Sequence, residues 1–241
     1  KCTALTDVVI PDSVVAVGEW AFYKCTSLTS AVCSAGLAEI GDIFSHCTAL
    51  KSVVVPQGVT SLKGTFASCI SLASVEIPDS VTTIGEGVFQ ECSGLTNMVI
   101  PDSVTMIGYG AFAYCTALTD VVISNSVETI DEDAFIKCEA LTSIGIPNSV
   151  TKIDKSAFDG CSGLTSVIIP EGTTEIADSV FGGCKALTNV VIPRGVTKIG
   201  DSAFDCSRLT IYCEASSRPS GWSPNWNSSS CPVVWGHKQG N

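Results

Sequence analysis

The chain has 241 residues, of which 24 are acidic and 13 are basic, and its net charge is −11. Hydrophobic residues make up 45% and charged residues only 15%, a composition that provides a large core and excludes intrinsic disorder. The acidity and the lack of a basic stripe argue against a nucleic-acid partner, and no apolar run is long enough to predict insertion into a membrane.

Cysteine recurs along the chain at an almost constant interval of 22 or 23 residues. These cysteines divide residues 2–205 into nine units of the form C-x-x-L-T-x-V-x-I-P-x-S-V-T-x-I-G-x-x-A-F-x-x-C. Such a period indicates a solenoid, in which each unit contacts only its neighbours. We therefore assign residues 1–205 to a nine-unit array and residues 206–241 to a C-terminal capping segment. The regularly spaced cysteines are Cys2, Cys25, Cys47, Cys69, Cys92, Cys115, Cys138, Cys161, Cys184 and Cys206.

Each unit is predicted to begin with a short strand, because L-T-x-V-x-I alternates and is rich in β-branched residues. A proline follows in most units and removes a backbone donor, which ends the strand. A turn and a second extended segment, S-V-T-x-I, come next. The last part of the unit, such as residues 156–160, is predicted as a helical turn that directs Phe158 inward. The prolines are Pro11, Pro56, Pro78, Pro101, Pro147, Pro170 and Pro193.

No single unit can bury its Leu, Val, Ile, Phe and Cys side chains by itself. Units that stack as parallel coils bury these side chains as continuous columns. The regularly spaced cysteines then lie in single file, and a buried free thiol that behaves as a small hydrophobe explains them best. The sequence therefore predicts columns of identical side chains along the solenoid axis.

The V-x-I-P and A-F-x-x-C segments resemble the BspA-like branch of the leucine-rich repeat family over nearly the whole array. The resemblance implies a right-handed solenoid of short parallel strands, turns and short helical or 3₁₀ segments. It also implies secreted or surface-attached proteins of host-associated bacteria and mucosal protists, which act in adhesion and protein binding. An extracellular or cell-surface location is expected on this ground.

The capping segment contains two features that the units lack. Cys213 and Cys231 lie 18 residues apart, and in an oxidising compartment a disulfide between them would stabilise the cap by about 3 kcal/mol. Trp222, Trp226 and Trp235 either cover the last open coil or form an aromatic platform that stacks on a glycan. Both interpretations of the tryptophans stay open at this level.

No catalytic motif accompanies the repeat. The two histidines, His46 and His237, are far apart, and phosphate-binding loops, nucleophile elbows and zinc-protease motifs are absent from the sequence. The cysteine spacing does not match a zinc site. The carboxylates between residues 128 and 139 form either a solvated edge or an adventitious divalent-ion site. We expect a non-enzymatic protein with no cofactor and no dedicated metal.

In each first strand, the residue between the two inward positions points outward. This outward column is mostly aliphatic, with interruptions at Glu76 and Gly145. A contiguous apolar band commonly marks an interface, although β propensity alone also places β-branched residues on exposed strands. The band predicts a module that binds a partner protein, such as a host extracellular protein. The alternatives are a spacer that presents another domain and a glycan-binding capping segment. We call the aliphatic members of this column the apolar stripe: Val9, Val32, Val54, Val99, Val122, Ile168 and Val191.

Overall fold

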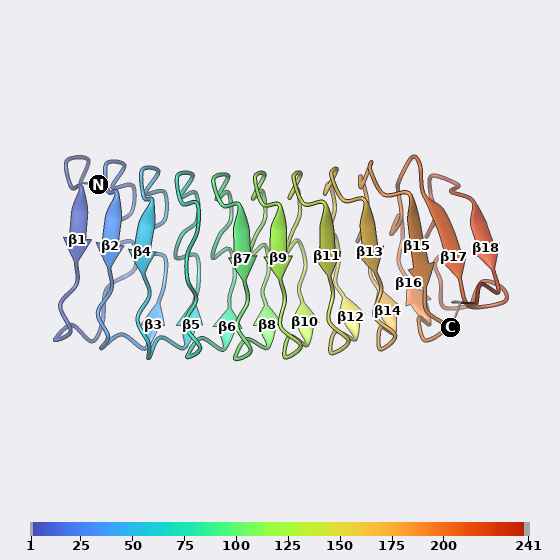
Figure 1. Ribbon diagram of the computed structural model, residues 1–241, viewed down its shortest axis with the longest axis horizontal. Coiled ribbons are helices and arrows are strands. Elements are labelled where there is room, and N and C mark those ends of the chain that lie inside the picture. Colours follow the sequence, from blue (N-terminus) through green and yellow to red (C-terminus); the bar gives the residue numbers. More distant parts are fainter. Residues whose placement is uncertain (1, 239–241) are drawn as a thin grey trace.

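The repeats fold into coils that stack side by side along one axis, as the computed structural model shows for residues 2–238 (Figure 1). We name each coil after the cysteine that opens it, so that the Cys92 coil begins at residue 92. Every coil that pairs with its neighbour does so through parallel strands, which form a row of main strands and a row of second strands. The predicted parallel solenoid is confirmed.

The main strands occupy the L-T-x-V-x-I segment of the coils. In most of them the middle residue is more buried than its neighbours, for example in the strand that contains Val121. The main strands are β1 (Asp7–Val9), β2 (Ser30–Val32), β4 (Ser52–Val54), β7 (Asn97–Val99), β9 (Asp120–Val122), β11 (Ser143–Gly145), β13 (Ser166–Ile168), β15 (Asn189–Ile192), β17 (Thr210–Cys213) and β18 (Val233–Trp235).

The second strands form one continuous sheet along the array. Its register places the inward aliphatic residues in a column, in which Ile84 lies between Leu62 and Ile107. The second strands are β3 (Glu39–Ile40), β5 (Ser61–Leu62), β6 (Thr83–Ile84), β8 (Met106–Ile107), β10 (Thr129–Ile130), β12 (Lys152–Ile153), β14 (Glu175–Ile176) and β16 (Lys198–Ile199).

The row of main strands is interrupted, unlike the row of second strands. Its strands pair only within four groups, β1-β2-β4, β7-β9, β11-β13 and β15-β17-β18. The Cys69 coil has no main strand at all, because residues 74–76 form no ladder with the coil on either side. The array is therefore held together continuously on one side and in segments on the other.

The prediction of a helical turn before each cysteine is wrong, because residues 2–238 contain no helix. The segment consists of tight turns, such as the one closed by the Cys115 N–H donating to the Phe112 carbonyl at 3.2 Å. The residue before most of the cysteines adopts a left-handed backbone, with φ of 61° at Tyr114 and 59° at Lys137. A left-handed residue cannot continue a right-handed helix, so the turns stay separate.

Phenylalanine and cysteine form the two regular columns of the core. All nine phenylalanines stack from Phe22 to Phe204, with adjacent ring centroids 5.1 to 6.2 Å apart. Beside them, each thiol from Cys47 to Cys206 donates a hydrogen bond, at 3.0 to 3.3 Å, to the carbonyl of the phenylalanine that lies three residues before the preceding cysteine of the column. The predicted single file of cysteines is confirmed, although Cys2 is exposed.

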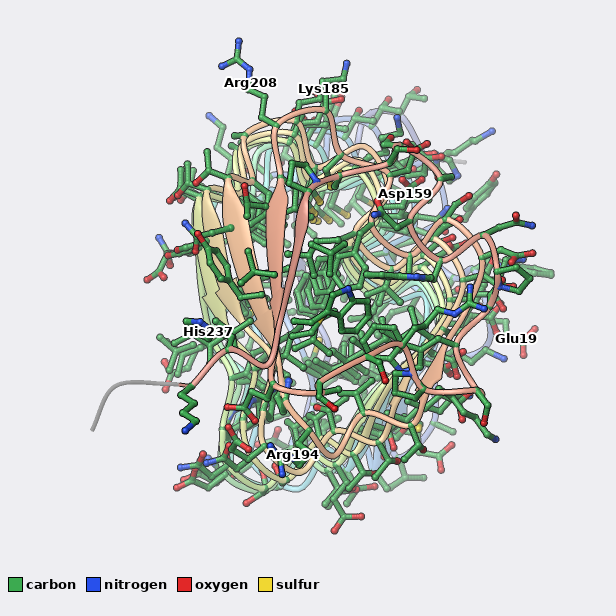
Figure 2. The ribbon with its side chains drawn as sticks, turned by 90° about the vertical axis from the view of Figure 1, so that its right-hand side faces the viewer. Glu19, Asp159, Lys185, Arg194, Arg208 and His237 are labelled. Carbon is green, nitrogen blue, oxygen red and sulfur yellow. The ribbon has the colours of Figure 1, made fainter. Side chains whose placement is uncertain are left out.

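The chain after Cys206 follows the same path as the coils before it. Strand β17 pairs with β15, and β18 then pairs with β17. The Cys231 thiol donates to the Cys206 carbonyl at 2.9 Å and so extends the cysteine column by one position. Figure 2 looks along the axis from this end and shows the main strands on one side of a core filled with side chains.

Candidate protein-binding face

The apolar stripe lies on the outer surface of the main strands, as the alternation of these strands predicts. Val9, Val99 and Ile168 are 70%, 64% and 76% exposed, and Val32, Val54 and Val122 are also exposed. Val191 is only half-buried rather than fully exposed, and its register partner on β17 is the larger side chain of Tyr212. Six of the seven stripe residues are therefore exposed to a partner.

The register of the main strands brings some stripe residues together and separates others. Val9, Val32 and Val54 are successive partners across β1, β2 and β4. Val99 and Val122 are partners across β7 and β9. Glu76 separates these two groups, so the stripe consists of patches rather than one unbroken band.

A groove opens where the main strands are interrupted at the Cys69 coil. It has a volume of about 610 Å³ and lies between residues 74–79 and β7. Its walls include Val99 and Val122 of the stripe, together with three carboxylates. A smaller hollow of about 320 Å³ lies on the other side of the same coil, against Val54. The carboxylates of the larger groove are Glu76, Asp79 and Asp102.

The repeat pattern marks Glu76 only as an interruption of the stripe and does not predict the groove. The available signal was that Glu76 is the single acidic residue in a mostly aliphatic column. Alternation assigned this side chain to the outer face correctly, because Glu76 is exposed. The loss of strand pairing on both sides of it depends on the spacing of neighbouring coils, which the repeat pattern does not report.

Small polar side chains run along the face beside the stripe. Asp7 begins β1 and accepts hydrogen bonds from Ser30 on the next coil and from Thr29 at 3.4 Å. These bonds, with that from Ser30 as the largest contribution, lower the pKa of the Asp7 carboxyl below its ordinary value. The rim of the groove has a similar bond, in which the Ser124 hydroxyl donates to Asp102 Oδ1 at 2.7 Å. At both places a carboxylate of one coil is therefore hydrogen-bonded to a hydroxyl of the next coil.

Cys213 and Cys231 are separate, buried thiols in this structure, and the disulfide between them stays a prediction. In the register of β17 and β18, Cys213 lies opposite Trp235, four residues beyond Cys231. Cys231 instead joins the cysteine column through its bond to the Cys206 carbonyl. Burial raises the pKa of the Cys213 thiol to about 12, which makes it a poor nucleophile.

The tryptophans of the last coil pack against the end of the core. Trp222 and Trp226 are buried, with ring centroids 4.9 Å apart, and Trp226 meets Phe204 edge-on at 6.0 Å. The Trp222 indole N–H donates to the Val196 carbonyl at 3.0 Å. Trp235 is half-buried against both rings. This packing supports the capping interpretation over a sugar platform, because the two buried rings present no open face.

Within residues 2–238, no group of three or more His, Cys, Asp and Glu is placed to hold a metal ion. Desolvation raises the pKa of most buried thiols, to about 11 at Cys47 and about 12 at Cys115.

No helix among residues 2–238 has the length and apolar character needed to cross a bilayer.

A parallel solenoid whose coils repeat aliphatic, phenylalanine and cysteine columns is the architecture of a leucine-rich repeat protein. The sequence matches the BspA type Leucine rich repeat region in six copies, over residues 1–119 and 107–215. The chain therefore belongs to the BspA-type leucine-rich repeat family. No curated protein matches the chain.

Solved bacterial structures share this fold. A leucine-rich repeat protein from Bacteroides ovatus is 28% identical, with a TM-score of 0.84, and the alignment covers 96% of this chain and 63% of that one. A leucine rich cell surface protein from Faecalibacterium prausnitzii is 30% identical, with a TM-score of 0.53. The alignment covers 99% of this chain and 82% of that one. A leucine-rich repeat protein from Eubacterium ventriosum, 22% identical with a TM-score of 0.65, shows the same fold. The chain thus spans under two thirds of the Bacteroides ovatus protein.

Proposed function

We propose that this chain is a non-enzymatic recognition module that binds a partner protein through the outer face of its main strands. The exposed apolar stripe supports this proposal, since isolated aliphatic residues are ordinary on a surface but aligned ones favour an interface. Val99 and Val122 are adjacent in register and also line the groove, so they form the centre of the proposed contact.

We place the module outside the cell. The family match and the description of the Faecalibacterium prausnitzii protein as a cell surface protein support this location. A partner in that setting is an extracellular protein, and a host protein fits the adhesion role implied by the family. The capping tryptophans have no part in this binding, because their packing is directed toward the core.

The test compares two double variants in the same pair of coils. Val99→Lys with Val122→Lys places charge in the stripe, whereas Met106→Lys with Thr129→Lys places the same charge on exposed positions of β8 and β10. Binding to a panel of immobilised extracellular matrix and mucosal proteins is measured for both by surface plasmon resonance. We expect only the first pair to weaken binding, by at least about tenfold, because it introduces two desolvated charges. An equal effect of the two pairs would overturn the face assignment.

A further inference from the structure

The groove at the Cys69 coil combines three features that together suit an extended ligand. The first is unpaired backbone. In some other coils the residue after the main strand donates to the next coil, as Ile100 N–H does to the Val122 carbonyl at 2.9 Å and Cys33 N–H to the Val54 carbonyl at 3.2 Å. Within residues 2–238, no backbone or side-chain group bonds to the N–H or carbonyl groups of residues 74–77. Extended backbone with free donors and acceptors is the surface to which an extended peptide binds.

The second feature is uncompensated negative charge. Glu76, Asp79 and Asp102 line the groove, and its lining contains no Lys, Arg or His. The ion pairs of residues 2–238 all lie elsewhere, as between Lys63 and Glu86 or Lys198 and Glu175. The groove therefore has carboxylates that no cation of the described chain neutralises.

The third feature is an aliphatic wall. Val99 and Val122 are exposed, and Val75 is half-buried, in the same groove. An aliphatic wall beside carboxylates fits a long basic side chain, whose methylene stem packs on apolar surface while its cationic end reaches the acid. An alternating segment of basic and small aliphatic or hydroxyl residues fits the backbone, the wall and the charges together.

We propose that this groove binds an extended, lysine- or arginine-bearing segment of the partner protein, and that Glu76 receives the basic side chain. The proposal rests on the proposed function and names the chemistry of its partner. Charge complementarity supports it, because the chain has a net charge of −11 and the groove concentrates three carboxylates on the proposed binding face. Lysine and arginine both provide the long cationic side chain that the groove requires, and arginine adds bidentate pairing with a carboxylate.

The test uses the whole chain and two fluorescein-labelled synthetic decapeptides. One alternates Lys with Thr and Val, and the other replaces every Lys with Glu. Fluorescence polarisation measures binding at low and at physiological salt. We expect saturable binding of the basic peptide only, weakened by salt because the carboxylates are solvent-accessible.

Three variants locate the binding. Glu76→Gln removes the central charge, and Glu76→Val restores the aliphatic column of Val54 and Val99, so that loss of binding cannot be attributed to a disrupted fold. Glu171→Gln is the matched control, because it removes one exposed carboxylate just after the main strand of the Cys161 coil, outside the groove. We expect both Glu76 variants to raise the dissociation constant of the basic peptide about fivefold or more and the control to leave it unchanged.

Two results would overturn the proposal. Absence of saturable binding by the basic peptide would exclude a cationic segment as occupant. Equal weakening by Glu76→Gln and Glu171→Gln would show attraction by overall acidity instead of a site. Failure of this proposal is distinguishable from failure of the proposed function. If binding of a partner protein is weakened by the Val99 and Val122 variants but not by the Glu76 variants, the binding face is correct and only the role of the groove is wrong.

Discussion

Replacing Phe112 with alanine should destabilise the array far more than the same change at Phe22. Phe112 is fully buried in the middle of the stack, with ring centroids 5.2 Å from Phe89 and 5.1 Å from Phe135. Phe22 is half-buried and has one stacked phenylalanine, Phe44, at 5.5 Å. The two changes therefore remove the same atoms from different degrees of burial.

The magnitudes follow from the burial and the ring contacts. A fully buried phenylalanine lost to alanine costs about 3–5 kcal/mol, and each aromatic pair is worth about 0.5–1.5 kcal/mol beyond burial. Because Phe112 loses two pairs, we expect a loss of about 5 kcal/mol in the free energy of unfolding. Because the Phe22 variant loses one aromatic pair and about half the buried area, we expect a loss of about 2 kcal/mol in its free energy of unfolding.

Urea unfolding followed by circular dichroism measures both changes. Because solenoid coils are coupled only to their neighbours, the Phe112 variant should also broaden or split the transition, since it weakens the middle of the array. Native-state hydrogen exchange would then show loss of protection around β8 and β10. Equal losses at the two positions, or a loss under about 2 kcal/mol at Phe112, would refute the claim that the stacked rings carry the core.

Three further predictions concern other parts of the array. Gly64→Ala should lower the free energy of unfolding by about 1–2 kcal/mol in a thermal-melt comparison, because Gly64 has φ of +58° and its added Cβ would overlap the Asp42 carboxylate. Adding Asp42→Ala to this variant should recover the part of the loss that comes from the overlap, but not the part that comes from the backbone conformation. Thiol labelling of the native protein at pH 8 should modify Cys2 quickly and leave the other twelve of 13 cysteines slow, while a reductant should leave the melting temperature unchanged; rapid modification of several thiols would contradict the buried column. Burial raises the pKa of the Asp159 carboxyl, because desolvation disfavours its charged form in the folded state. The protonated carboxyl therefore contributes stability that is fully present below pH 3.8 and is lost as the pH rises through the raised pKa. Asp159→Asn should therefore raise the melting temperature at pH 7 and have no effect near pH 3, and the opposite order would disprove the sign.

Much of the architecture was predictable because a repeat turns local patterns into a global arrangement. Alternation in V-x-I assigned the inner and outer residues of the main strands, as Val121 and Val122 show. The period alone placed phenylalanine and cysteine in columns, since equivalent residues of stacked coils must face each other. The helical turn was predicted wrongly, because the left-handed backbone of residues such as Tyr114 has no signal in the sequence.

The end of the array was less predictable for a different reason. The interval from Cys206 to Cys231 is 25 residues, and tryptophans occupy the region where earlier coils place phenylalanine, so the segment no longer matches the unit. Pairing of β18 with β17 nevertheless extends the solenoid through this segment. Backbone pairing tolerates changes of side chain and loop length that a sequence pattern does not.

By itself the sequence determined the solenoid, its inward and outward faces, and the stripe, because all of these follow from periods of two and of 22–23 residues. The tertiary structure alone decided which coils stay paired, which carbonyl the Cys231 thiol bonds to, and where the face opens at Glu76. Those outcomes depend on distances of a few tenths of an ångström to a few ångströms between neighbouring coils, and backbone hydrogen bonds form or fail over that range. Residue identity sets which groups are available, whereas the spacing of the coils sets which of them bind.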